Sequence, residues 1–191
     1  MNIEDALSQR INLPQIKRLA SWASGNPENL RHLWSLAGAD NRRTSVNALW
    51  VMTHLPAIDS EWIVAQRDMI IDMLLSETDT AKKRLLLQIL KQQDFAPENI
   101  RIDLLDFCLS KINSEHEPYA IRCFSIYTAF NLCKHYPELL AELKEHLELM
   151  SYQSLSPGLN SALRQTQKKI QKLKPALKIA DSQPNRNITC A

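Results

Sequence analysis

Histidine and glutamate, two residue types that bind transition metals, lie close together in residues 135–146. Glu138, Glu142 and His146 follow one another at intervals of four, so on a helix they share one face, and His135 precedes them. Carboxylate and imidazole groups are ligands for zinc and iron. A metal centre needs ligands that converge from more than one element, and no second cluster of such residues occurs in the sequence. We therefore interpret these residues as the solvated face of an acidic helix and predict neither a metal nor another cofactor.

Basic residues stand near the start of several predicted helices, where the helix dipole disfavours cations. They are Arg42, Arg43, Lys82, Lys83, Arg84 and Arg122. One interpretation is a row of cations that binds an acidic partner or phosphates. The alternative is an internal ladder, in which each arginine pairs with the acid that opens a neighbouring repeat: Asp40, Asp79 or Glu117. We take Arg42, Arg43, Lys82, Lys83 and Arg84 as candidate binding residues and leave both interpretations open.

All four tryptophans lie in the first third of the chain: Trp22, Trp34, Trp50 and Trp62. Exposed tryptophans are typical of a binding groove, and half-buried ones of a core. The leucines beside Trp34 and Trp50 favour core packing. We keep Trp22 and Trp50 as further candidates for binding.

Motifs of the common enzyme classes are missing. The sequence has no GxSxG, no P-loop, no GxGxxG and no HExxH, and its three glycines leave little material for a loop that cradles phosphate. We therefore expect a protein that is not an enzyme.

Helical patterning runs through most of the chain and predicts an all-α fold. Few glycines are available for tight hairpins, and caps, prolines and apolar spacing divide the chain into helices. The expected ranges are 13–24, 27–37, 40–54, 59–75, 79–93, 97–112, 118–134, 137–150 and 157–173. The helix at 118–134 is apolar nearly all round, because its polar residues come every third position. We expect it to be among the most buried.

An internal repeat links three of these helices. ADNRRTSVNALWVMTHL, DTAKKRLLLQILKQ and EPYAIRCFSIYTAFNL each begin with an acid or cap, continue with basic residues and end in an aliphatic run. Aligning Asn47, Arg84 and Arg122 gives spacings of 37 and 38, and residues 156–173 form a weaker fourth copy. A period near 40 that contains two helices is typical of helical repeats of the HEAT and armadillo class.

The third copy resembles the second helix of a HEAT repeat, with Pro118 in the opening turn and the pair Ile121-Arg122 after it. This resemblance covers about residues 27–173. It implies a right-handed α-α superhelix of about four helix pairs, a scaffold that binds protein partners, and an internal ladder at Arg122. Because fold does not imply function, it names no ligand.

Nucleic acid is the alternative partner, since some HEAT-like proteins excise alkylated bases from DNA. Trp22 or Trp50, Arg42, Arg43 and Asp40 are the residues that such a site would use here. However, residues 1–150 carry a net charge of −4, whereas residues 151–191 carry +6. An acidic body disfavours tight binding of duplex DNA, so we expect a protein partner.

The domain organisation predicted from the sequence is one repeat domain at 1–174 and a mobile tail at 175–191. We expect residues 157–173 to pack on the preceding helix as a cap, with their cations opposite its glutamates, and only the part beyond Pro175 to be free. Cys108, Cys123 and Cys133 lie in helical runs and are expected to be reduced, which favours a cytoplasmic protein. No apolar stretch is long enough to span a membrane. The sequence leaves the oligomeric state open.

Overall fold

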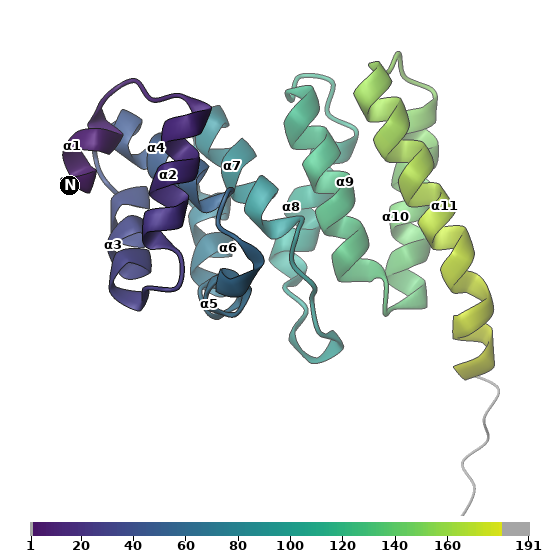
Figure 1. The fold of residues 1–191 in the computed structure, drawn as a ribbon. Helices are drawn as coiled ribbons and strands as arrows, with labels where there is room; N and C mark the ends of the chain where they lie inside the picture. The colour runs from purple at the N-terminus through teal and green to yellow at the C-terminus, as the bar shows by residue number, and fades with distance from the viewer. Residues whose placement is uncertain (1, 181–191) are drawn as a thin grey trace, which may run out of the picture. The chain divides into compact units, whose positions relative to one another are not determined.

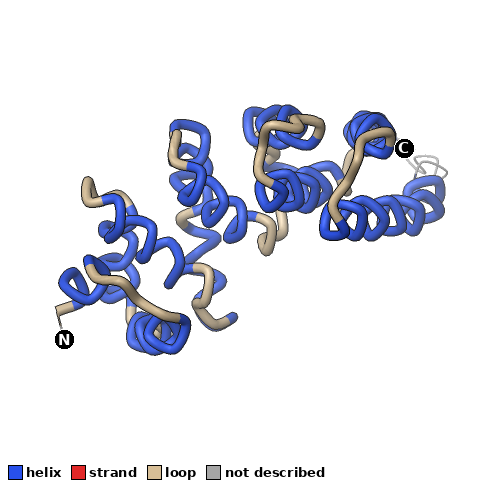
Figure 2. The backbone as a smooth tube through the Cα atoms, turned by 90° about the horizontal axis from the view of Figure 1, so that it is seen from above, coloured by secondary structure: helices blue, strands red, loops and turns tan. Residues whose placement is uncertain are grey.

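The computed structural model describes residues 2–180 and is built from helices joined by loops, with no strand in that range (Figures 1 and 2). The chain divides into two compact units, residues 1–93 and 94–191. Each unit is described by itself below.

The first unit contains seven α-helices and one short 3₁₀ helix. They are α1 (Ile3–Ser8), α2 (Leu13–Ala23), α3 (Pro27–Ala37), α4 (Arg42–Met52), η1 (Ala57–Asp59), α5 (Ser60–Ala65), α6 (Arg67–Ser76) and α7 (Thr80–Leu90). α3 packs on α4 and α6 packs on α7, and these two pairs are joined because α4 also packs on α7. α1 and α2 both cover α4. α4 is therefore the central helix of this unit, which explains why Ala48, Leu49 and Val51 are fully buried.

Side-chain caps fix where the helices of this unit begin. Asn2, Asn12, Asn26, Asn41 and Asp79 each accept hydrogen bonds from backbone N–H groups in the first turn of the helix that follows. Asn12 and Gln15 form a complete capping box. Such caps satisfy donors that have no partner within the helix, so the helix starts are set locally by the sequence.

The second unit contains η2 (Pro97–Asn99), α8 (Ile102–Ile112), α9 (Tyr119–Cys133), α10 (Pro137–Ser151) and α11 (Pro157–Ala180). α9 packs on α8, α10 and α11, and α10 also packs on α8 and α11. As predicted, α9 is among the most buried helices, and Arg122, Ser125 and Thr128 lie inside with its apolar residues. In both units the helices that carry the repeated sequence pattern pack side by side, α4 on α7 and α9 on α11.

The all-α prediction is confirmed, and the boundaries differ in four places. The helix expected at 97–112 is divided into η2 and α8, and α8 begins only at Ile102. α1 was not predicted, although Asn2 is its cap and Glu4 and Asp5 lie in its first turn. The single helix expected at 59–75 is broken at Gln66, and only after this break do Ile70, Ile71 and Leu74 turn into the core, whereas α5 buries no residue. α11 continues past Pro175 to Ala180, and residues 181–191 of the predicted tail lie outside the described residues.

A helix that crosses a membrane is long and predominantly apolar. In the described part of the chain, no helix combines the length and the apolar character that crossing a bilayer requires.

Candidate interaction surface

The five candidate basic residues lie at the N-terminal ends of two helices that pack together. Arg42 and Arg43 are the first residues of α4, and the other three lie in the first five residues of α7. We call this set the basic edge: Arg42, Arg43, Lys82, Lys83 and Arg84. The fold therefore brings together five cations that are up to 42 positions apart in the sequence.

An ion pair joins the two helix ends. The Arg42 Nε lies 2.5 Å from the Asp79 Oδ2, while the Asp79 Oδ1 accepts hydrogen bonds from the N–H groups of Ala81 and Lys82. Burial by itself would raise the pKa of Asp79, but the hydrogen bonds from Arg42 and from these two N–H groups lower it below its ordinary value. Asp79 thus serves as the cap of α7 and as the counter-charge of Arg42.

The remaining cations of the basic edge differ in what they contact. The Lys82 Nζ lies 3.5 Å from the Glu77 Oε2, and both side chains are largely buried. Lys83 is half-buried, whereas Arg43 and Arg84 are exposed. Over residues 2–180 no acid pairs with Arg43 or Arg84. The ladder interpretation thus fits Arg42, and Arg43 and Arg84 remain available to a partner.

Arg122 has a different role from the basic edge. It is only 2% exposed, its Nε donates to the carbonyl of Ile112 at 2.9 Å, and its Nη2 donates to the Gln153 Oε1 at 2.5 Å. Ile112 is the last residue of α8, so the guanidinium satisfies a carbonyl that the helix leaves without an internal partner. Neither acceptor is an acid that opens a neighbouring repeat, so the ladder predicted at Arg122 does not form, and Glu117, which opens the same repeat, pairs with Lys111 at 2.7 Å. Arg122 therefore holds the α8–α9 hairpin together through neutral acceptors.

The structural counterpart of Arg122 in the first unit is Ser45. Its hydroxyl donates at 2.5 Å to the carbonyl of Ala37, the last residue of α3, and Ser45 is the fourth residue of α4 as Arg122 is of α9. The sequence alignment had placed Asn47 at this position, two residues too late. Asn47 is also buried, but its Nδ2 donates to the carbonyls of Leu7 and Gln9 at the end of α1. Neither residue was predicted as structural, because a serine or asparagine within an apolar run gives no strong signal.

The tryptophan candidates are apart from the basic edge. Trp22 lies on α2, and Trp50 lies eight residues along α4 from Arg42, which corresponds to about 12 Å of helix. All four tryptophans are half-buried. The ring of Trp50 packs edge-on against His54, with centroids 6.3 Å apart.

The metal-ligand candidates do not converge. His135, Glu138 and Glu142 are exposed, and the half-buried His146 forms a hydrogen bond through Nδ1 with the Nδ2 of Asn113 at 3.1 Å. Within residues 2–180 there is no group of three or more histidine, cysteine or acidic residues placed to hold a metal.

Cys108 on α8 and Cys133 on α9 are buried and belong to no disulfide among the described residues. Burial raises the pKa of the Cys108 thiol well above its ordinary value and raises that of Cys133 to about 12. Both are therefore protonated at neutral pH and lack the nucleophilic thiolate form.

Comparison with known proteins gives one result that covers most of the chain. The sequence model of the HEAT repeat domain matches residues 3–170, which includes helices of both units. A search of curated proteins finds no match.

Proposed function

The chain belongs to the HEAT repeat domain family, and on that premise we propose that it is a non-enzymatic scaffold whose basic edge binds an acidic segment of a partner protein. The repeat fold supports the scaffold role. The observation that carries the binding role is the pair of exposed arginines, Arg43 and Arg84, on two adjacent helix ends.

Local electrostatics support an anionic partner at this place. The N-terminal end of a helix carries a partial positive charge, and α4 and α7 add the charges of the basic edge to theirs. Glu77 and Asp79, the acids nearest in sequence to the cations of α7, are already engaged by Lys82 and Arg42. A carboxylate from a partner would meet cations that have no competing intramolecular acid, and guanidinium groups bind carboxylates with two parallel hydrogen bonds.

The size of the basic edge supports a peptide carboxylate over duplex DNA. A duplex binder commonly makes about six to ten phosphate contacts. Here two of the five cations are paired within the chain, and residues 1–150 are net acidic. The base-excision alternative also calls for Asp40 and a tryptophan beside Arg42, but Trp50 is more than two helical turns away.

The test is a pair of titrations followed by fluorescence anisotropy at about 0.15 M salt, where the Debye length is roughly 8 Å. One labelled ligand is a 12-residue peptide rich in Asp and Glu, and the other is a 20-base-pair DNA duplex. We expect the peptide to bind with a Kd of about 10 μM and to weaken about tenfold as salt rises to 0.5 M, because exposed charge pairs are screened. The duplex is expected to bind at least tenfold more weakly than the peptide.

Two results would contradict the proposal. If the peptide did not bind at about 1 mM protein, its binding free energy would be less than roughly 4 kcal/mol. This result would rule out an acidic protein segment as the partner. Sub-micromolar duplex binding that weakens steeply with salt would establish the nucleic-acid alternative instead.

A further inference from the structure

A recess of about 330 Å³ lies between the first two helices of the first unit. α1 and α2 both pack on α4, and the space between them is left open. The residues that line it come from α1, from the connection after it and from α2: Ala6, Gln9, Ile11, Gln15, Arg18 and Leu19. We call it the α1–α2 recess.

Hydrogen bonds fix both sides of the α1–α2 recess. The Nδ2 of Asn47 on α4 donates to the carbonyls of Leu7 and Gln9 at 2.8 and 3.0 Å, which anchors the end of α1. The capping box fixes the start of α2, where the Gln15 Oε1 accepts a hydrogen bond from the Asn12 N–H at 2.8 Å. The recess is therefore already formed in the absence of a ligand, as small-molecule sites usually are.

The walls of the α1–α2 recess are largely aliphatic. Ala6, Ile11 and Leu19 contribute methyl groups, and among the described residues no aromatic or acidic side chain lines it. Its volume is about twice that of a cavity of roughly 150 Å³, which accommodates benzene. A saturated chain of about eight carbons suits such a space, because it needs neither a stacking partner nor a hydrogen bond along its length.

Two hydrogen-bond donors on α2 are available at this recess. Gln15 and Arg18 are one helical turn apart and lie on the same face as Leu19. Over residues 2–180, neither the Nε2 of Gln15 nor the exposed guanidinium of Arg18 has a partner. Residues 9–19 also contain three cations and no acid. These donors favour an anion, and a carboxylate is the group that a guanidinium binds with two parallel hydrogen bonds.

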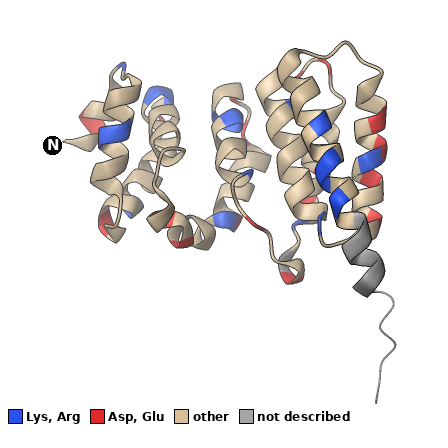
Figure 3. Ribbon diagram, turned by 45° about the vertical axis from the view of Figure 1, so that its right-hand side comes forward, with Lys and Arg blue, Asp and Glu red and all other residues tan. Residues whose placement is uncertain are grey.

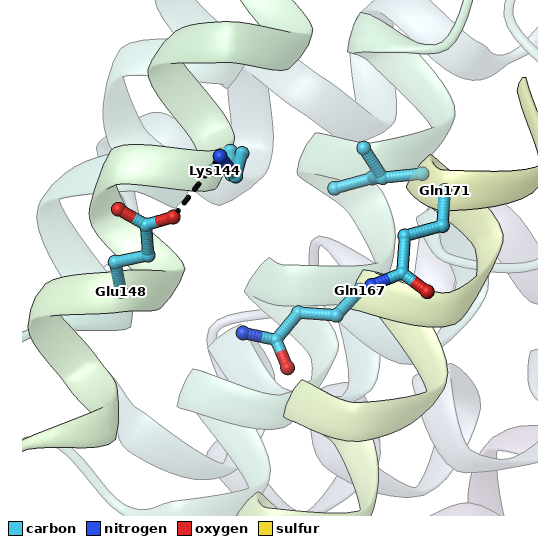
Figure 4. A pocket seen from close by; sticks show the side chains of 5 residues that line it. Lys144, Glu148, Gln167 and Gln171 are labelled. Carbon is cyan, nitrogen blue, oxygen red and sulfur yellow. Dashed lines mark ion pairs between the residues drawn. The ribbon is translucent and has the colours of Figure 1, made fainter. Parts of the chain in front are cut away.

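The recess between α10 and α11 of the second unit has a different lining (Figure 4). Its volume is similar, about 320 Å³, but its two charged residues, Lys144 and Glu148, contact each other at 3.1 Å. Gln167 and Gln171 line its other side. This second recess therefore offers a ligand no charge that lacks a counter-ion.

The other charges of α10 and α11 do not pair across the two helices. Figure 3 marks acidic positions on α10 and basic positions on α11, but in the part of the chain that the structure describes no ion pair connects them. The expected pairing of α11 cations with α10 glutamates is therefore wrong, although Leu159, Leu163 and Ile170 are buried as predicted.

We propose that the α1–α2 recess binds a small molecule, an unbranched aliphatic carboxylate of about eight carbons. Its carboxylate pairs with Arg18 and accepts a hydrogen bond from the amide of Gln15, and its chain lies along the aliphatic walls. This site is separate from the basic edge, because a peptide rich in Asp and Glu has no aliphatic chain to fill the recess. A peptide terminus is disfavoured, since its backbone N–H groups would need acceptors that aliphatic walls lack.

The test is a titration of the ¹⁵N-labelled full chain with octanoate at about 0.05 M salt, followed by amide chemical shifts in NMR spectra. Octanoate is kept below the concentration at which it forms micelles. We expect shifts concentrated in residues 6–19 and a Kd of about 0.5 mM. Hexanoate should bind about fourfold more weakly, because two fewer methylene groups are buried. 1-Octanol, which has no charge, should bind about fivefold more weakly or worse.

Three variants separate the role of the charge from that of the space. Arg18→Gln should weaken octanoate binding about fivefold and leave 1-octanol binding unchanged, because only the charge is removed. Ala6→Leu places a larger side chain in the recess and should abolish the binding of both molecules. Arg31→Gln is the matched control, since Arg31 is exposed on α3 and has no partner among the described residues. It should bind octanoate as the unaltered chain does, and circular dichroism checks that every variant stays helical.

Four outcomes would overturn the proposal. The first is an absence of localised shifts at about 5 mM octanoate, and the second is 1-octanol binding as tightly as octanoate. The third is equal weakening by Arg18→Gln and Arg31→Gln, which would mean that octanoate responds only to net charge. The fourth is a short peptide ending in leucine that binds in the recess more tightly than octanoate, which would make a protein terminus the ligand instead.

Discussion

The α3–α4 hairpin of the first unit and the α8–α9 hairpin of the second use different side chains to satisfy the last carbonyl of their first helix. In each, the fourth residue of the second helix donates a hydrogen bond to the last carbonyl of the first helix. Ser45 does so with a short neutral hydroxyl across a connection of residues 38–41. Arg122 does so with a long charged guanidinium across residues 113–118, and it reaches Gln153 as well.

This difference shows how a degenerate repeat can keep its fold although its sequence changes. In these two hairpins a buried donor stands at the same position and satisfies the carbonyl at a helix end, which would be costly to bury without a partner. Charge at that position is incidental, so a cation in the first turns of such a helix is not by itself a sign of a binding site. Arg122 is structural, and the candidates for function are the cations that have no such acceptor.

The largest loss of stability is expected when Arg122 is replaced. Replacing it with Met keeps an apolar chain of similar length but leaves the carbonyl of Ile112 and the amide of Gln153 without their donor. We expect a loss of about 3 kcal/mol in the free energy of unfolding, measured by urea denaturation. Arg31→Met, at an exposed position on α3, serves as the control and should stay within about 0.5 kcal/mol. Equal losses in the two variants would mean that the buried guanidinium does not stabilise the hairpin.

A smaller loss in the free energy of unfolding is expected when Ser45 is replaced, because only a neutral hydrogen bond is removed. Ser45→Ala should cost about 1 kcal/mol in the same measurement, because the carbonyl of Ala37 loses a buried donor. Ser35→Ala is the matched control, since that serine is exposed and its hydroxyl bonds only to His32 of its own helix. If Ser45→Ala matched or exceeded the effect of Arg122→Met, the comparison of a neutral with a charged donor would fail.

The link between α4 and α7 is expected to be weaker still and to depend on pH. Because the pKa of Asp79 is lowered in the folded chain, its carboxylate stabilises the fold at pH values above the ordinary pKa of 3.8, and this stabilisation is lost as pH falls through the lowered value. Asp79→Asn keeps a capping side chain but removes the charge, so it should cost about 0.5 kcal/mol at pH 6. The cost should disappear at acidic pH below the folded pKa. A cost that is the same at both pH values would show that the charge of Asp79 is not involved.

The smallest change in stability is expected at Arg84. Its side chain is exposed and meets no acid among the described residues, so Arg84→Met should alter the free energy of unfolding by less than about 0.5 kcal/mol. Thermal unfolding followed by circular dichroism measures this. A loss of unfolding free energy comparable to that of Ser45→Ala would mean that Arg84 stabilises the fold, as Arg122 does.

Most of the helices could be predicted because their ends are encoded locally. Asn41 and Asp79 are strong caps, and the prolines at 27, 137 and 157 suit the first turn of a helix. The break at Gln66 could not be predicted, because the apolar pattern continues across it, and only the structure shows that Ile70 and Ile71 after the break are buried while α5 buries no residue. Helix periodicity does not carry that information.

The candidate surface could be predicted only in part. The cations were visible in the sequence, but their partners were not: Arg42 and Asp79 are 37 positions apart and meet only because α4 packs on α7. The repeat alignment slipped by two residues at Asn47, because a helix that is apolar on several sides gives several registers of similar quality. The distinction between Arg84 and Arg122 depends on burial, which the sequence pattern leaves open.

The central claim is that Arg43 and Arg84 bind an acidic segment, and one titration tests it most directly. The labelled acidic peptide is titrated at about 0.15 M salt with the double variant Arg43→Glu, Arg84→Glu and with a control of equal net charge, Arg18→Glu, Arg31→Glu. Our account predicts that the first variant weakens binding at least tenfold, because two exposed cations become repulsive, while the control changes it less than about threefold. Equal weakening by both variants would contradict the account, since it would mean that the peptide responds only to net charge and not to the basic edge.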